Sequence, residues 1–144
     1  IGQDVVRFEV QQHSDVTYRL YDWGRDRPMH IEQGMRVLRE PRGIPSVVEP
    51  TTIDAHTEWL VRDERFGLRR LRATEPMRLS TNGRCQVMTV IDGHASVGWH
   101  SGGEHPPLAV RRGESVLIPA VANEVFVSPI GAMVALVAEP GSRR

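Results

Sequence analysis

The sequence predicts a mainly β protein, built as a sandwich or barrel with one short helix. Two observations support this fold class. After residue 50, short apolar and β-branched runs alternate with turn-forming residues at the spacing seen in sandwiches and barrels. One earlier segment, residues 29–38, carries apolar side chains at helical spacing. The chain has 144 residues, of which 40% are hydrophobic, so it can bury a core.

The first 24 residues carry two strand-like runs. Residues 4–10 and 16–21 alternate between apolar and polar side chains, and Ser14-Asp15 between them has turn chemistry. We therefore expect a hairpin or tight corner in which Glu9 and Arg19 share a polar face. The sequence begins inside the strand pattern and without an initiator methionine, so we also expect a truncated or processed product.

A short helix and a connector follow. Ile31, Met35 and Leu38 lie at i, i+4 and i+7, which predicts a helix over residues 29–38, although Gly34 weakens it. Residues 40–50 contain three prolines and a glycine, which is typical of an extended connector.

The rest of the chain predicts β-strands. Asp92-Gly93 has the composition of a type I′ turn and predicts a hairpin between the two strands that flank it. The expected strands are Thr57–Arg62, Phe66–Ala73, Met77–Leu79, Cys85–Ile91, Ala95–His100, Leu108–Val110, Ser115–Ile118, Glu124–Ser128 and Ala132–Ala138.

Composition excludes several classes of function. The formal net charge is zero, whereas a nucleic-acid partner requires a surplus of basic residues. No apolar run has the roughly 18–20 residues of a membrane span, and no secretory signal opens the sequence. All 18 basic residues are arginine, which excludes Schiff-base chemistry and a Walker lysine in this chain. A single cysteine, Cys85, fits a reducing compartment and predicts a cytoplasmic location.

The spacing of Gly113 and Pro119 resembles the second cupin motif, G-x5-P-x-G-x2-H-x3-N. The metal-binding part of that motif is replaced, because Val121 stands at the second glycine and Glu124 at the histidine. The H-x-H of the first cupin motif is absent, and Glu124 alone does not provide the three or four ligands of a zinc or iron site. We therefore expect a cupin-type jelly-roll sandwich without metal ligands.

The segment from Glu9 to Trp23, E-V-Q-Q-H-S-D-V-T-Y-R-L-Y-D-W, resembles the E-x-Q-Q-x-S-D-x-T-Y-R-x-Y-D-W/Y segment of bacterial type I mannose-6-phosphate isomerases. These are zinc-dependent cupins that interconvert mannose 6-phosphate and fructose 6-phosphate. The resemblance implies that this chain is the C-terminal portion of such an isomerase, inactive as a fragment. It also implies that the zinc ligands of the full-length enzyme lie upstream, with none in this chain.

The resemblance implies that Arg19 and Glu9 are catalytic. A guanidinium fixed near the oxyanion of an enediolate stabilises it electrostatically, and Arg19 stands where the family has its active-site arginine. A carboxylate at Glu9 could orient that arginine, hold a substrate hydroxyl or move a proton. The alternative is a surface arginine paired with Glu9 or Asp15, which contributes little.

Three residues near these two carry weaker expectations. Gln11, Asp15 and Tyr21 are expected to support the corner through hydrogen bonds. His30 belongs to a stretch that resembles the family's R-P-L-H-I-E sequence, which implies a structural role in capping or interdomain packing. The residues that bind substrate are unknown.

The resemblance implies three regions. Residues 1–24 would be the closing strands of a catalytic cupin half whose upstream part is absent, residues 25–50 the short helix and Pro-rich connector, and residues 51–144 a degenerate, metal-free cupin domain. Two functions remain open: part of an isomerase acting on a small sugar phosphate, or a non-catalytic cupin module that binds a sugar or a protein partner. An unpaired N-terminal strand would allow a homodimer.

Overall fold

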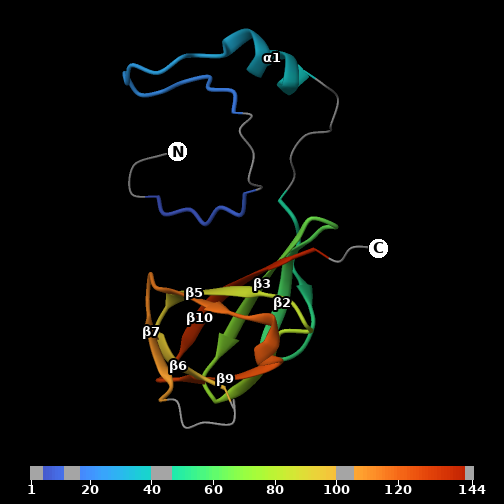
Figure 1. The fold of residues 1–144 in the computed structure, drawn as a ribbon, viewed down its shortest axis with the longest axis vertical. Helices are drawn as coiled ribbons and strands as arrows, with labels where there is room; N and C mark the ends of the chain where they lie inside the picture. Colours follow the sequence, from blue (N-terminus) through green and yellow to red (C-terminus); the bar gives the residue numbers. More distant parts are fainter. Residues whose placement is uncertain (1–4, 12–16, 40–46, 100–105, 142–144) are drawn as a thin grey trace. The chain divides into compact units, whose positions relative to one another are not determined.

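The computed structural model describes residues 5–11, 17–39, 47–99 and 106–141. The chain divides into two compact units, Ile1–Val47 and Val48–Arg144, called unit 1 and unit 2 below. Unit 1 contains helix α1, and unit 2 contains the β-sheets (Figure 1). Within the described ranges, no helix is both long and apolar enough to cross a bilayer.

The N-terminal segment differs from the sequence expectation. Residues 5–11 and 17–22 contain no strand, so the two strands expected there are wrong for these ranges, and the Ser14-Asp15 turn lies outside the described residues. Val5 and Val6 are exposed by 57% and 98%. An extended segment is stable when a neighbouring strand pairs with its backbone, and no described strand pairs with these residues.

Helix α1 spans Ile31–Arg39, which confirms the short helix expected from the apolar spacing. The carbonyl of His30 accepts the first helical hydrogen bond from the Gly34 N–H at 2.8 Å. Glu32 places a negative charge in the first turn, where it complements the helix dipole. Gly34 is buried against the Leu20 side chain, and a Cβ at this position would overlap Leu20. Gly34 therefore weakens the helix but permits its contact with the preceding segment.

Unit 2 consists of short antiparallel strands, as the sequence predicted. Three of them have the expected bounds, and most of the others differ by one or two residues at an end. The strands are β1 Thr51–Thr52, β2 Thr57–Arg62, β3 Phe66–Ala73, β4 Met77–Ser80, β5 Gln86–Asp92, β6 His94–Gly98, β7 Leu108–Arg111, β8 Ser115–Ile118, β9 Glu124–Pro129 and β10 Met133–Pro140. The short β1 and a 3₁₀ turn at Ala120–Ala122 were not predicted.

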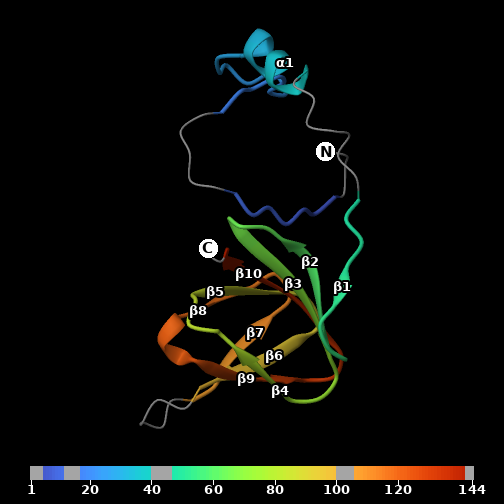
Figure 2. The ribbon, with the colours of Figure 1, turned by 90° about the vertical axis from the view of Figure 1, so that its right-hand side faces the viewer.

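The strands form two sheets that face each other as a sandwich (Figure 2). One sheet has the order β1-β2-β3-β10-β5-β8, and the other has the order β4-β9-β6-β7. The central strand β10 pairs with both β3 and β5. This arrangement confirms the mainly β class with one short helix.

The hairpin expected at Asp92-Gly93 is wrong. The flanking strands β5 and β6 belong to different sheets, so the chain turns a corner here instead of forming a ladder. Gly93 does adopt the left-handed backbone that the sequence predicted, with φ of 71°. Because β5 is already paired on both sides by β10 and β8, β6 has no free edge of β5 to join.

The space between the sheets is filled by apolar side chains. Met88, Val127 and Val137 have no exposed surface. The buried cluster consists of Leu71, Ala73, Leu79, Met88, Val90, Ala95, Val97, Val110, Ile118, Val125, Val127, Met133, Ala135 and Val137. Burial of such side chains contributes about 1.5–3 kcal/mol each for the larger ones, so unit 2 has the core of an independently stable fold.

A buried group of charged and polar side chains adjoins this core. The Glu139 carboxylate accepts hydrogen bonds from Arg69 at 2.7 Å and from the Gln86 side chain at 3.0 Å. Gln86 has no exposed surface, and the Arg69 and Glu139 side chains are 10% and 5% exposed. A buried ion pair of this kind is stable only when further hydrogen bonds satisfy its atoms, and Gln86 provides one of them.

Candidate functional site

Arg19 lies in unit 1 with its side chain held on two sides. Its terminal nitrogen donates a hydrogen bond to the Pro28 carbonyl at 3.2 Å, and its Nε lies 3.7 Å from the Asp22 carboxylate. The side chain is 23% exposed. The guanidinium has five N–H donors in a planar fork, so several of them remain available to a ligand.

The backbone of Arg19 is fixed by His30. The His30 N–H donates to the Arg19 carbonyl at 2.8 Å, and the Arg19 N–H donates to the His30 Nδ1 at 3.3 Å. His30 directly precedes α1, so the helix start and Arg19 are connected by two hydrogen bonds. The structural role expected for His30 is thus a bridge between the helix and Arg19. Interdomain packing stays a prediction.

Asp22 is the buried carboxylate of this region, at 7% exposure. Arg27 binds both of its oxygens, with a distance of 2.7 Å from Nε to Oδ2 and a second contact from the terminal nitrogen to Oδ1. The hydrogen bond from Arg27 lowers the pKa of Asp22, burial opposes this shift, and the charges of Arg27, Arg19 and Arg25 lower it further. The same bond raises the pKa of Arg27. Asp22 is therefore ionised at neutral pH.

We call Arg19, Asp22, Arg27 and His30 the Arg19 cluster. Two guanidinium groups share one carboxylate in it, which leaves a surplus positive charge. Arg27 uses both contact positions of Asp22 in a bidentate arrangement, whereas Arg19 stands at a longer distance. The cluster can attract an anion, and Arg19 is the cation of the pair that is less engaged with the carboxylate.

The sequence reasoning found Arg19 but missed Asp22 and Arg27. A turn brings these two together, since Trp23 and Gly24 have φ of 55° and 75° and the Arg25 N–H bonds to the Asp22 carbonyl at 3.1 Å. The signal for this turn was the Trp-Gly pair, because glycine readily adopts a left-handed backbone.

Among the described residues, Glu9 pairs with Arg7 and not with Arg19. Its carboxylate forms an ion pair with Arg7 at 2.6 Å, and the two side chains are 48% and 60% exposed. The shared polar face expected for Glu9 and Arg19 therefore has no hydrogen bond or ion pair to support it within the described residues. Such an exposed pair contributes little to stability.

The weaker candidates are dispersed. Tyr21 is 68% exposed and packs edge-on against Trp23, with ring centroids 5.1 Å apart. Gln11 is exposed, and Asp15 lies outside the described residues. Tyr18 instead contacts the Arg19 cluster, because its ring lies 6.1 Å from that of His30.

The motif positions of unit 2 do not face a metal site. Val121 is 85% exposed, and Glu124 forms an ion pair with Arg78 at 3.6 Å on the surface. Gly113 keeps its turn role, with φ of 86°. In the described ranges, no three His, Cys, Asp or Glu side chains come together in a group that could hold a metal ion.

Comparison with known proteins identifies relatives that match most of the chain. It matches no protein-family model. It is 28% identical over 130 residues to mannose-6-phosphate isomerase of Streptococcus mutans, a match that covers 83% of this chain and 39% of the relative. The chain thus spans about two fifths of the length of the curated relatives it matches.

Two solved structures show the fold. The mannose 6-phosphate isomerase of Bacillus subtilis matches 87% of this chain and 40% of its own, with a TM-score of 0.67 and 19% identity. An RmlC-like cupin of Methanocaldococcus jannaschii, described as a double-stranded β-helix, matches 69% of this chain and 94% of its own, with a TM-score of 0.53 and 17% identity. The cupin-type fold expected from the Gly113 motif is confirmed.

Proposed function

We propose that this chain, whose homologues are mannose-6-phosphate isomerases and whose fold is of the cupin type, forms the C-terminal part of such an isomerase. The reaction would interconvert mannose 6-phosphate and fructose 6-phosphate. Residues 1–24 would close a catalytic cupin half, residues 25–50 would be the short helix and connector, and residues 51–144 would be a degenerate cupin domain. This assignment accounts for strand-like sequences in residues 5–11 and 17–22 that have no partner among the described residues.

The observation that carries the proposal is the surplus positive charge of the Arg19 cluster. Isomerisation of an aldose to a ketose passes through an enediolate, whose oxygen gains negative charge in the transition state. A guanidinium already fixed near that oxygen stabilises the charge without reorganisation. In support of this role, the Arg19 side chain is held by Asp22 and the Pro28 carbonyl, and its backbone is held by His30.

Glu9 has a secondary role in this proposal. Its carboxylate would hold a substrate hydroxyl or move a proton, as the resemblance implies. The ion pair with Arg7 involves exposed side chains, so a substrate can replace it at low cost.

Zinc does not fit the described residues of this chain, because they contain no group of three or more ligands. The proposal therefore assigns zinc to residues of the complete enzyme outside this chain, and no step here is derived through the metal. A chain that contained zinc and turned over mannose 6-phosphate by itself would contradict this placement.

The test is substitution of Arg19 in the complete isomerase that contains this chain. We expect Arg19→Gln to lower kcat by about 10²–10³-fold, the loss typical when an oxyanion-stabilising donor is removed. Arg36→Gln is the matched control, since Arg36 is an exposed arginine of α1 in the same unit. If Arg19→Gln retained the kcat of the Arg36→Gln control, the catalytic role of Arg19 would be refuted.

A second function rests on unit 2. Its interior is filled by apolar side chains and carries no metal group among the described residues, which supports a non-catalytic cupin module that binds a sugar or a protein partner. This function predicts that the chain folds by itself and binds without turnover, whereas the isomerase function predicts activity only with the missing half supplied.

The proposal also includes the binding partner, the cellular location and the oligomeric state of the enzyme. Its partner would be a small sugar phosphate and not nucleic acid, in line with the formal net charge of zero. Its location would be the cytoplasm, in line with the exposed free thiol of Cys85. Pairing of the N-terminal segments of two chains would produce a homodimer, which sedimentation analysis can test.

A further inference from the structure

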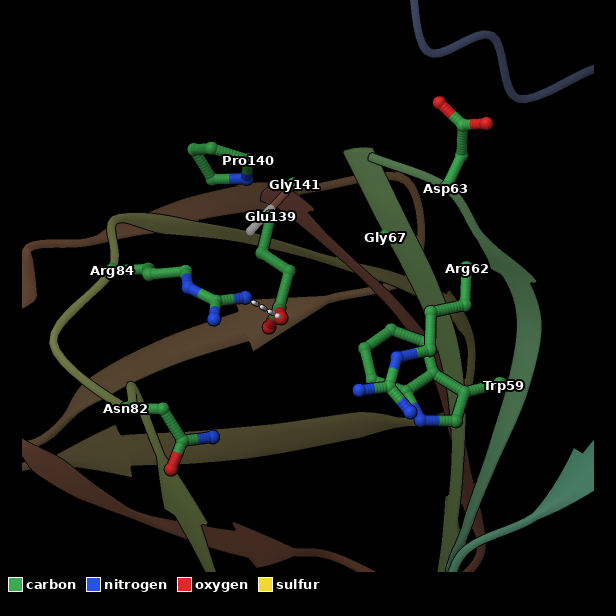
Figure 3. Close-up of a pocket in the computed structure, with 9 residues that line it drawn as sticks. All are labelled: Trp59, Arg62, Asp63, Gly67, Asn82, Arg84, Glu139, Pro140 and Gly141. Atoms are coloured by element: carbon green, nitrogen blue, oxygen red, sulfur yellow. Dashed lines mark hydrogen bonds and ion pairs between the residues drawn. The ribbon is translucent and has the colours of Figure 1, made fainter. Parts of the chain in front are cut away.

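Unit 2 contains a polar pocket that is separate from the Arg19 cluster. The pocket has a volume of about 150 Å³ and lies where β2, the β4–β5 turn and the end of β10 meet. Figure 3 shows Trp59 and Arg62 on one side of it, with Arg84 and Glu139 facing them. We call it the Trp59 pocket. At roughly 30 Å³ per water molecule, the space is sufficient for a phosphate-sized group and a few attached atoms.

Trp59 is fixed and in turn positions Arg62. A Cβ at Gly67 would lie 2.7 Å from the Trp59 ring, so the absence of a side chain there lets the indole pack against β3. Arg62 and Arg69 both stack on the ring, with their guanidinium carbons 5.5 and 5.3 Å from its centre. Cation–π contact holds an arginine in place while leaving its N–H groups free to donate.

Each carboxylate of the pocket has an arginine beside it that does not line the pocket. Glu139 has its own cation in the buried Arg69, at 2.7 Å. Asp63 pairs with Arg65 at 3.5 Å and also accepts a hydrogen bond from the Arg65 N–H. Neither Arg69 nor Arg65 lines the pocket. Glu139 is therefore compensated from outside the pocket, whereas Asp63 is compensated only in part, because Arg65 also pairs with Glu64 at 3.4 Å.

The lining carries two arginines and two carboxylates, and with the outside partners Arg69, Arg65 and Glu64 counted, one positive charge remains in surplus. Within the described ranges, no carboxylate forms an ion pair with Arg62, which stacks on the Trp59 ring. Arg84 contacts the second oxygen of Glu139 at 3.3 Å, and its side chain is 37% exposed. Because Glu139 is already paired with Arg69, its carboxylate neutralises Arg84 only in part.

Asn82 adds a neutral donor. The Ser80 hydroxyl donates to the Asn82 Oδ1 at 3.1 Å, and the Asn82 backbone N–H bonds to the same hydroxyl at 3.2 Å. The side-chain oxygen is thus engaged, and the amide NH₂ is available to an acceptor in the pocket. Asn82 holds this position with a left-handed φ of 50°.

From this arrangement we infer that the Trp59 pocket binds the phosphate group of a small phosphorylated metabolite. The guanidinium groups of Arg62 and Arg84 and the amide of Asn82 are donors suited to phosphate oxygens. The surplus positive charge favours an anion, and a phosphate monoester is a dianion above its second pKa of about 6. This site is independent of the catalytic role proposed for Arg19.

The test is calorimetric titration of the 144-residue chain at pH 7.5 with inorganic phosphate, fructose 6-phosphate, fructose and acetate. We expect saturable binding of the two phosphate compounds and none of fructose or acetate. Arg62→Gln should weaken binding at least tenfold. Arg78→Gln is the matched control, because Arg78 also stacks on an aromatic ring at 5.5 Å but belongs to the other sheet.

A second readout locates the site. The sequence has three tryptophans, and phosphate should shift the indole N–H resonance of Trp59 in wild type but not in Arg62→Gln. Arg62 makes no ion pair within the described ranges, so Arg62→Gln should fold. It therefore tests binding even if Arg84→Gln, which loses a contact with Glu139, fails to fold.

Four outcomes would overturn the inference. Absence of saturable phosphate binding, equal binding of acetate, or unchanged affinity in Arg62→Gln would each refute a phosphate site in this pocket. Binding that is lost in Arg19→Gln and retained in Arg62→Gln would refute it while supporting the Arg19 cluster. The converse pattern would support the pocket and leave the Arg19 proposal to the isomerase assay.

Discussion

The α-carbon of Gly93 lies against the carbonyl oxygen of Ala132, so closely that a Cβ on Gly93 would overlap it. This contact joins the corner between β5 and β6 to the start of β10. Gly93 also has a left-handed φ of 71°. The position thus requires glycine for two independent reasons, one steric and one conformational.

Gly93→Ala should destabilise unit 2 by about 3 kcal/mol, the sum of a left-handed alanine at about 1–2 kcal/mol and overpacking at about 1–3 kcal/mol. Gly131→Ala is the control, because Gly131 has φ of 74° and a Cβ added to it would meet no atom within 4 Å. We expect a loss of about 1 kcal/mol there. Urea unfolding followed by far-ultraviolet circular dichroism measures both, and equal losses would show that the Ala132 contact has no energetic effect.

The folded structure of the Arg19 cluster should depend on pH through the ionisation of Asp22. Its pKa is lower in the folded state than in the unfolded state, mainly because of the hydrogen bond from Arg27. The stabilisation from ionised Asp22 is therefore complete above the pKa that Asp22 has in the unfolded chain. It is lost as pH falls through the lower pKa that Asp22 has in the folded chain. We expect the amide resonances of Arg19 and Gly34 to lose their native positions at pH values below about 4, the usual pKa of an aspartate.

Substitution isolates the contribution of this carboxylate. Asp22→Asn should disturb the same resonances already at pH 7 and should flatten their dependence on pH below 4. Asp26→Asn, an exposed aspartate of the same turn, should leave the wild-type acid transition in place. An unchanged transition in Asp22→Asn would assign the acid sensitivity to another group.

The buried pair of Arg69 and Glu139 should be costly to break. Glu139→Gln leaves Arg69 without its carboxylate, and removing one partner of a buried pair typically costs 3–5 kcal/mol. Glu124→Gln removes a surface pair with Arg78 and should change stability by no more than about 0.5 kcal/mol. Denaturant unfolding of the two variants tests this difference. A loss below about 1 kcal/mol for Glu139→Gln would show that water or rearranged neighbours replace the carboxylate.

The sequence predicted the strands of unit 2 well because local alternation and a self-contained core agree there. Strands 57–62, 66–73 and 115–118 have the expected bounds. Pairing was harder to predict, since the turn chemistry of Asp92-Gly93 determines a backbone angle but not which sheet the next strand joins. The sheet that β6 joins depends on the pairing of β5 with β10 and β8, and that pairing involves strands distant in the sequence.

In unit 1, the sequence pattern predicted the secondary structure less well. Its alternating runs predicted strands, but alternation specifies a strand only when another strand accepts its hydrogen bonds. For the candidate site, the motif pointed to Arg19, whereas its contact with Asp22 depends on the turn at Trp23 and Gly24. The Trp59 pocket was not predicted because its residues come from three separate parts of the sequence.

The single cysteine has a practical consequence. Cys85 is an exposed free thiol, and its neighbours in sequence are Arg84, which lines the Trp59 pocket, and Gln86, which belongs to the buried polar group. One maleimide dye therefore attaches to this chain at one known position, next in sequence to a residue that lines the pocket. Its emission would report occupancy of that pocket without any engineered labelling site.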